Sequence, residues 1–143
     1  MIGYFDTSAV LPLVLTEPGS ARCAELWLAC DARVSSMLVI AESHAALAQA
    51  RRLGRVTEEE YGAARELLDR RLDELDLVTL TRALAVRAGE LAVSEALRGY
   101  DAVHAASALA VQGPDTVFVA GDKVLLTAMA DLGMSTADTC ETV

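Results

Sequence analysis

The sequence is poor in lysine, in aromatic residues and in cysteine, and it lacks a long hydrophobic run. Lys123 is the single lysine among 12 basic residues, and 21 acidic residues bring the net charge to −9. Contacts to nucleic-acid phosphates depend on basic side chains, so this balance, taken alone, argues against nucleic-acid binding. Two interpretations of the acidic excess stay open: an ordinary solvated surface, or a local group of carboxylates that holds divalent cations.

No apolar stretch approaches the roughly 18 residues that a membrane helix needs. The nearest candidate, Ala9 to Leu15, contains Pro12 and follows an acid rather than a basic stretch. We therefore expect neither a signal peptide nor a membrane anchor. Cys23 and Cys30 lie about 10 Å apart along a predicted helix, which is too far for a disulfide. The three cysteines are expected to be reduced core residues of a cytoplasmic protein.

The length of 143 residues and the hydrophobic fraction of 53% are typical of one domain, here residues 1–143. Apolar runs and periodicity predict strands and helices in alternation. The expected strands are 2–5, 33–36, 77–80, 116–120 and a short one at 134–137. The expected helices are 7–15, 19–29, 38–52, 57–75, 81–97, 101–111 and 122–132. This alternation predicts an α/β fold with a mostly parallel sheet of about four or five strands flanked by helices.

Four acidic residues occupy positions where a parallel α/β fold places functional groups. Asp6 ends the first predicted strand, and Asp122 follows the strand 116–120 by two residues. Sites in such sheets lie beyond the carboxyl ends of the strands. Asp101 begins a predicted helix, and Glu42 lies in an otherwise apolar one. Taken singly, Asp101 and Asp122 could be helix caps, and Glu42 could face solvent.

Taken together, the four acids favour a metal site. Carboxylates only a few ångströms apart repel one another by roughly 4 kcal/mol per pair at an effective dielectric constant near 20. Such a group binds cations or becomes protonated, and oxygen ligands suit Mg²⁺ or Mn²⁺. Bound divalent ions would also let an acidic protein accept a phosphodiester at that one place.

Four segments of the sequence resemble, in order and spacing, the motifs of VapC-type PIN-domain toxins. They are Tyr4 to Ala9, Ser35 to Leu47 with Glu42, Leu97 to Leu109 with Asp101, and Phe118 to Asp122. The third segment is the most specific of the set, and together the segments span nearly the whole chain.

The resemblance implies a PIN-like three-layer α/β sandwich and metal-dependent endonucleolytic cleavage of RNA. It implies that Asp6, Glu42, Asp101 and Asp122 hold Mg²⁺, for which Mn²⁺ may substitute, and that Thr7 and Ser8 orient a carboxylate. It also implies a cognate VapB-type antitoxin as partner, and a homodimer.

One position departs from the family pattern, which often has threonine or serine where this chain has Ala120. Without that hydroxyl, a hydrogen bond that orients Asp122 is in doubt. A non-catalytic PIN-like binding module therefore stays open as an alternative. A haloacid-dehalogenase-like phosphatase is a weaker alternative, because the second acid of that family would stand at Ser8. His104, three residues after Asp101, is expected to pack beside the site rather than to act as a base.

Overall fold

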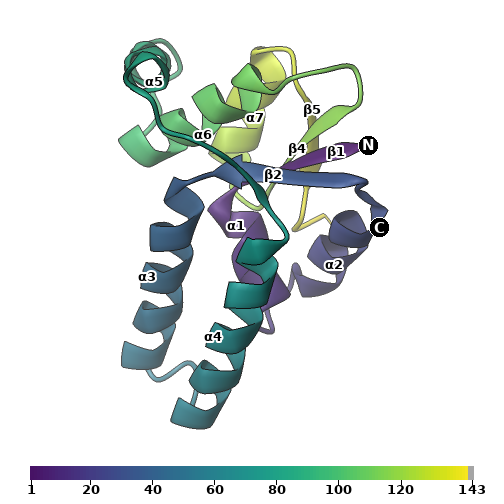
Figure 1. Ribbon diagram of the computed structural model, residues 1–143, viewed down its shortest axis with the longest axis vertical. Coiled ribbons are helices and arrows are strands. Elements are labelled where there is room, and N and C mark those ends of the chain that lie inside the picture. The colour runs from purple at the N-terminus through teal and green to yellow at the C-terminus, as the bar shows by residue number, and fades with distance from the viewer. Residues whose placement is uncertain (142–143) are drawn as a thin grey trace.

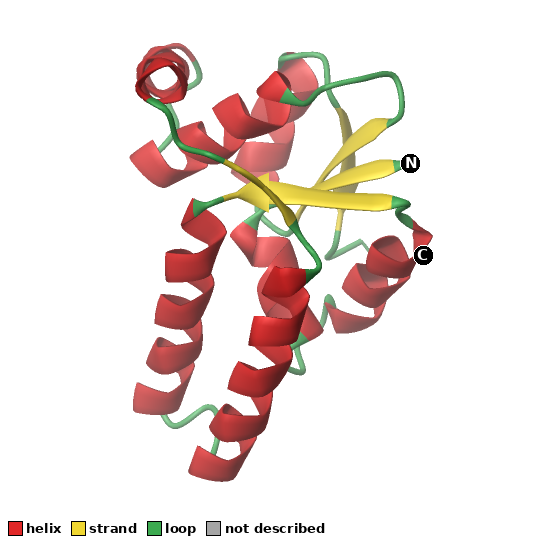
Figure 2. Cartoon of the chain, in the orientation of Figure 1, coloured by secondary structure: helices red, strands yellow, loops and turns green. Residues whose placement is uncertain are grey.

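The computed structural model describes residues 1–141 and contains one five-stranded sheet (Figure 2). The strand order is β3-β2-β1-β4-β5, and every neighbouring pair is parallel. The strands are β1 (Ile2–Phe5), β2 (Ala32–Ser36), β3 (Asp76–Val78), β4 (Thr116–Ala120) and β5 (Ser135–Asp138). The predicted α/β class is therefore confirmed, with a sheet that is parallel throughout.

Helices cover both faces of the sheet and make a three-layer sandwich (Figure 1). They are α1 (Thr7–Val10), the 3₁₀ helix η1 (Leu11–Leu13), α2 (Ser20–Ala29), α3 (Leu38–Arg52), α4 (Glu58–Asp73), α5 (Arg82–Ser94), α6 (Gly99–Ala110) and α7 (Lys123–Asp131). The first four α-helices lie on one side of the sheet, and α5, α6 and α7 lie on the other (Figure 1).

Alternating side chains of the central strands divide the interior into two cores. Tyr4 and Phe118 point to the face covered by α5, α6 and α7, where their rings stack with centroids 5.4 Å apart. Phe5 and Val119, the next residue of each strand, belong to the core beneath the first four helices. This alternation is the period of two expected of strands whose two faces are both buried. Trp27 packs edge-on against Phe5, so it is a core residue.

Several element boundaries differ from those predicted. The helix expected over 7–15 gives way to a 3₁₀ turn at Pro12, because proline cannot donate the next helical hydrogen bond. The helix expected to reach Leu97 ends at Ser94, and Ala96 adopts a left-handed φ of 52°. The helix predicted to start at Asp101 begins two residues earlier, at Gly99, so Asp101 lies within the first turn of α6.

A capping box begins α4, at the start of the helix predicted over 57–75. The Thr57 hydroxyl accepts from the Glu60 backbone N–H at 3.1 Å, and the Glu60 carboxylate accepts from the Thr57 N–H at 3.2 Å. All three cysteines are free thiols, and Cys23 and Cys30 are buried as expected. The prediction of a core position was wrong for Cys140, which is exposed in the turn after β5. Across residues 1–141, no helix combines the length and the apolar character needed to cross a membrane.

Candidate functional site

The carboxyl ends of β1 and β4 lie side by side in the middle of the sheet. From β1 the chain adds β2 and β3 on one side, and it later returns to add β4 and β5 on the other. This reversal is a topological switch point, the place where open α/β sheets form their sites. Asp6 directly follows β1, and Asp122 follows β4 by two residues. The structure therefore places these two predicted site residues at the position favoured by the topology.

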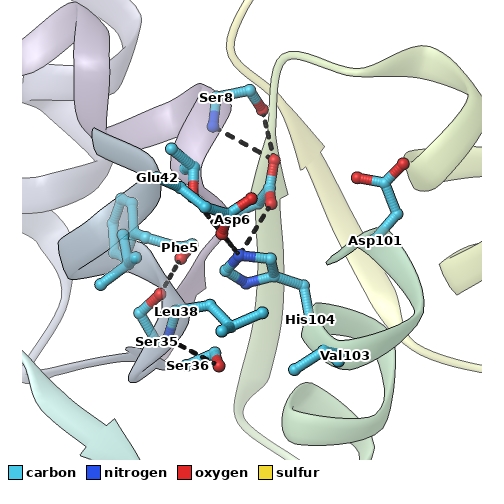
Figure 3. Close-up of polar contacts among 12 residues, drawn as sticks. Phe5, Asp6, Ser8, Ser35, Ser36, Leu38, Glu42, Asp101, Val103 and His104 are labelled. Carbon is cyan, nitrogen blue, oxygen red and sulfur yellow. Dashed lines mark hydrogen bonds and ion pairs between the residues drawn. The ribbon is translucent and has the colours of Figure 1, made fainter. Parts of the chain in front are cut away.

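Asp6 is held by the first turn of α1. Its Oδ2 accepts from the Ser8 hydroxyl at 2.7 Å and from the Ser8 backbone N–H at 3.2 Å (Figure 3). The backbone N–H of Asp6 continues the sheet by donating to the Val119 carbonyl at 3.0 Å. The side chain of Asp6 is only 8% exposed. A carboxylate at this depth is uncommon without compensating partners, which the Ser8 hydrogen bonds supply in part.

Glu42 reaches the same region from α3 and meets His104 of α6 (Figure 3). The distance from His104 Nε2 to Glu42 Oε1 is 2.6 Å, and from His104 Nε2 to Asp6 Oδ1 it is 3.6 Å. Because an ionised carboxylate only accepts, Nε2 carries the proton of this short contact. The hydroxyl of Thr7 also donates to Glu42 Oε1, at 3.0 Å. On its other side, His104 Nδ1 hydrogen-bonds with the Tyr4 hydroxyl at 3.0 Å.

The ionisation of this pair reflects burial opposed by direct contact. Burial favours neutral His104, but the hydrogen bond to Glu42 and the charges of Asp6 and Glu42 outweigh it and raise the His104 pKa. Burial also opposes ionisation of Glu42, yet His104 and Thr7 lower the Glu42 pKa. Both shifts favour a carboxylate hydrogen-bonded to an imidazolium.

Asp101 and Asp122 are bridged by a second cation, Arg98. Its Nε donates to Asp101 Oδ2 at 2.9 Å, and its Nη2 lies 3.7 Å from Asp122 Oδ2. Asp122 is the N-cap of α7, and its Oδ1 accepts from the N–H groups of Val124 and Leu125 at 2.9 and 3.2 Å. The capping role considered for Asp122 is thus real and coexists with its place at the site.

The Asp101 pKa is raised, first by burial and further by the nearby charges of Asp6 and Asp122, although Arg98 acts to lower it. This effect of Asp6 and Asp122 indicates that the acids from α6, β1 and α7 share one electrostatic environment. An added cation would therefore favour the ionised form of Asp101.

The four acids form two halves, each matched to a cation of the chain itself. His104 lies with Asp6 and Glu42, and Arg98 lies with Asp101 and Asp122. In this arrangement, residues 1–141 contain no three acidic, histidine or cysteine side chains already gathered as ligands of one metal ion. The donor set is nevertheless rich in carboxylate oxygens, the ligands that Mg²⁺ and Mn²⁺ prefer, and so fits such an ion.

The predicted supporting residues contribute in different ways. Ser8 orients Asp6, whereas Thr7 contacts Glu42 rather than the acid beside it. His104 packs beside the site, as expected, but its bond to Glu42 was missed. Its spacing of three from Asp101 places both residues on one helix face, but the sequence carries no signal for the contact with Glu42. Alanine at position 120 leaves Asp122 with its two capping hydrogen bonds.

Known proteins resemble this chain in sequence and in fold. Residues 3–128 match the PIN domain family. The ribonucleases VapC45 and VapC49, both from Mycobacterium tuberculosis, are each 44% identical over 124 residues, which cover 87% of this chain and 86% of theirs.

Solved structures share the fold at lower identity. PAE2754 from Pyrobaculum aerophilum superposes with a TM-score of 0.71 at 24% identity, over 95% of this chain and 83% of its own. The VapBC2 structure from Rickettsia felis, bound to a promoter DNA fragment, gives a TM-score of 0.66 at 14% identity, over 96% and 98% of the two chains. The match to the family model over most of the sequence, together with the 44% identity, shows that this chain belongs to the PIN-domain family, in its VapC branch.

Proposed function

We propose that this protein is a metal-dependent endoribonuclease that serves as the toxin of a toxin–antitoxin pair. The observation that carries the proposal is the arrival of four carboxylates, from β1, α3, α6 and α7, around one switch point of the sheet. Its two VapC relatives are ribonucleases, which supports the same reaction for this chain.

In the proposed site Asp6, Glu42, Asp101 and Asp122 would hold Mg²⁺, with Mn²⁺ as a substitute. The ion would supply charge stabilisation to the phosphodiester and would acidify the attacking water.

The chain's own residues position these ligands. The Ser8 hydroxyl fixes the rotamer of Asp6, and Thr7 with His104 fixes Glu42. Asp122 is aligned by the hydrogen bonds that it accepts from the Val124 and Leu125 N–H groups of α7. In this reaction the carboxylates hold the metal, and none of them needs to act as a covalent nucleophile.

The test is cleavage of pooled total RNA by purified protein with Mg²⁺, with Mn²⁺ and with EDTA. Asp6→Asn removes one charge at the centre of the site and is expected to abolish cleavage. The matched control is Asp73→Asn, the same change at an exposed residue at the end of α4, and it is expected to cut like the unmodified protein. Circular dichroism verifies that both variants remain folded.

Cuts that require metal and Asp6 would support the ribonuclease. Full activity of the folded Asp6→Asn variant would overturn the assignment of the site. Absence of cleavage by any form, with no metal binding, would favour the alternative of a non-catalytic PIN-like binding module. An enzyme with an RNA substrate is expected in the cytoplasm, which fractionation of cells would test.

We further propose a VapB-type antitoxin as partner. One structural neighbour is a toxin–antitoxin complex from Klebsiella pneumoniae, and another is VapBC-1 from Haemophilus influenzae. A net charge of −9 and the exposed edge of the acidic site suit a basic segment whose arginine pairs with the carboxylates. Co-expression with the adjacent reading frame is expected to give a complex that does not cut RNA. Separate elution of the two proteins would contradict this partner.

A homodimer is the assembly we propose for the toxin itself. The outer face of α5 exposes Val86 and Val93, which are 58% and 85% accessible. Light scattering at micromolar concentration is expected to give twice the mass of 15.1 kDa. A monomer at that concentration would contradict the dimer.

A further inference from the structure

Arg98 holds together the two acids that come from the starts of α6 and α7. Its guanidinium donates to Asp101 at 2.9 Å and lies 3.7 Å from Asp122. Within residues 1–141, no other basic side chain forms an ion pair with Asp101 or Asp122. One flexible arginine thus stands between two of the four proposed metal ligands.

The two cationic side chains of the site, His104 and Arg98, differ in how easily they can move away from the acids. The His104 ring is completely buried and fixed between Tyr4 and Glu42. The side chain of Arg98 is 75% exposed, and it projects from the residue that precedes α6. Water screens the exposed Arg98 end of these ion pairs and weakens them, although the Asp101 side chain is only 16% exposed. Arg98 can therefore exchange with another cation at small cost, whereas His104 cannot move without disrupting the core.

We propose that Arg98 is a built-in counter-ion that occupies Asp101 and Asp122 when no divalent ion is bound and competes with metal for them. This inference rests on the proposed function, because it concerns the same site. Metal loading then requires Arg98 to withdraw from both carboxylates into solvent. The apparent metal affinity of the protein is set partly by this residue, which is not itself a ligand.

The competition predicts that removing the arginine charge tightens metal binding. Mn²⁺ is the probe, and free Mn²⁺ is measured by electron paramagnetic resonance during titration of the unmodified protein and Arg98→Gln. We expect the variant to bind Mn²⁺ about tenfold more tightly. This factor corresponds to the Coulomb repulsion, in water, between a unit charge and a divalent ion several ångströms away. Arg98→Lys keeps the charge and loses the forked geometry, so an intermediate affinity is expected.

The matched control is Arg87→Gln, which removes an exposed arginine paired with Glu90 on α5. Its Mn²⁺ affinity is expected to equal that of the unmodified protein. A second measurement needs no substitution. The Nε–H resonance of Arg98 in a ¹⁵N spectrum, assigned with the Arg98→Lys variant, is expected to shift on addition of Mg²⁺ as its bond to Asp101 breaks.

Equal or weaker Mn²⁺ binding by folded Arg98→Gln, or an Arg98 resonance unmoved at saturating Mg²⁺, would overturn the competition. The proposed function would survive that result, because the metal would still bind and depend on Asp6. If neither the unmodified protein nor Arg98→Gln binds Mn²⁺, the metal-dependent function fails together with this inference. The two failures are thus distinguishable in one titration series.

Discussion

The backbone N–H of Gly121 donates a hydrogen bond of 2.9 Å to the hydroxyl of Ser8, and the same hydroxyl donates to Asp6 at 2.7 Å. One oxygen atom therefore connects the loop after β4 to the acid that ends β1, across 113 residues of sequence. Ser8 thus has two tasks, because it orients a proposed metal ligand and satisfies a partly buried N–H of the neighbouring loop.

Ser8→Ala is expected to lower the free energy of unfolding by about 1–3 kcal/mol, because the Gly121 N–H loses its partner. Cleavage is expected to fall as well, since Asp6 loses its shortest hydrogen bond. Urea unfolding measures the first effect and the RNA assay the second. The control is Ser94→Ala, whose hydroxyl makes only an exposed contact with Glu95. Equal stability of the two variants would contradict the role given to Ser8.

His104→Leu is expected to destabilise the fold by about 3 kcal/mol, because it strands the Glu42 carboxylate and the Tyr4 hydroxyl without their shared partner. His44→Leu is the matched control, since His44 is half-buried and pairs with the exposed Asp69. Its effect is expected to stay within about 0.5 kcal/mol. Similar denaturation midpoints for the two leucine variants would show that the His104 contacts are not stabilising.

Two glycine-to-alanine changes are expected to shift stability in opposite directions. A Cβ on Gly3, buried in β1, would lie 2.6 Å from the sulfur of Cys30 and from a ring carbon of Phe5, so Gly3→Ala forces the core apart. We expect a loss of about 1–3 kcal/mol. Gly62 is exposed within α4 with open space around it, and Gly62→Ala is expected to add about 0.5–1 kcal/mol. Thermal unfolding of both variants checks the prediction, and destabilisation by Gly62→Ala would contradict it.

One of the three thiols is expected to react quickly with a thiol reagent in the native protein. Cys140 is exposed, whereas Cys23 is fully buried and burial raises its pKa to about 11. Burial raises the pKa of Cys30 too, so both core thiols remain protonated at about pH 8. Their burial also keeps the reagent away from them. A colorimetric thiol assay should count one group before and three after denaturation. Cys140→Ser should remove the fast group, and a persisting fast reaction would contradict this assignment.

The sequence predicted the central features of this fold because they depend on local patterns. The helix over 38–52 and the strands over 2–5 and 116–120 were predicted at their observed bounds, since each is a clear apolar pattern followed within two residues by an acid or a glycine. The helix predicted to end at Leu97 ends at Ser94. Alanine seldom adopts a left-handed backbone, so the sequence carries no signal for the φ of 52° at Ala96.

The sequence is enough to nominate the four acids of the candidate site, but not to say which cation each acid pairs with. Position after a strand marks Asp6 and Asp122, and the family motifs mark Glu42 and Asp101. Which cation compensates which acid depends on the rotamers of Arg98 and His104 in the folded state. The Arg98–Asp101 pair has the i, i+3 spacing of neighbours on one helix, but the His104 contacts join residues up to 98 positions apart, and no spacing rule reveals those.

The strand order has a consequence for biosynthesis. The partner of β1 on one side is β4, which begins at Thr116, and Asp122 comes later still. A ribosome must therefore translate the chain through Asp122 before the four acids can meet. A chain released early, before β4, leaves the first strand with an unpaired edge and the centre incomplete. If the protein degrades RNA as proposed, its topology postpones that activity until the chain has been made at least as far as Asp122.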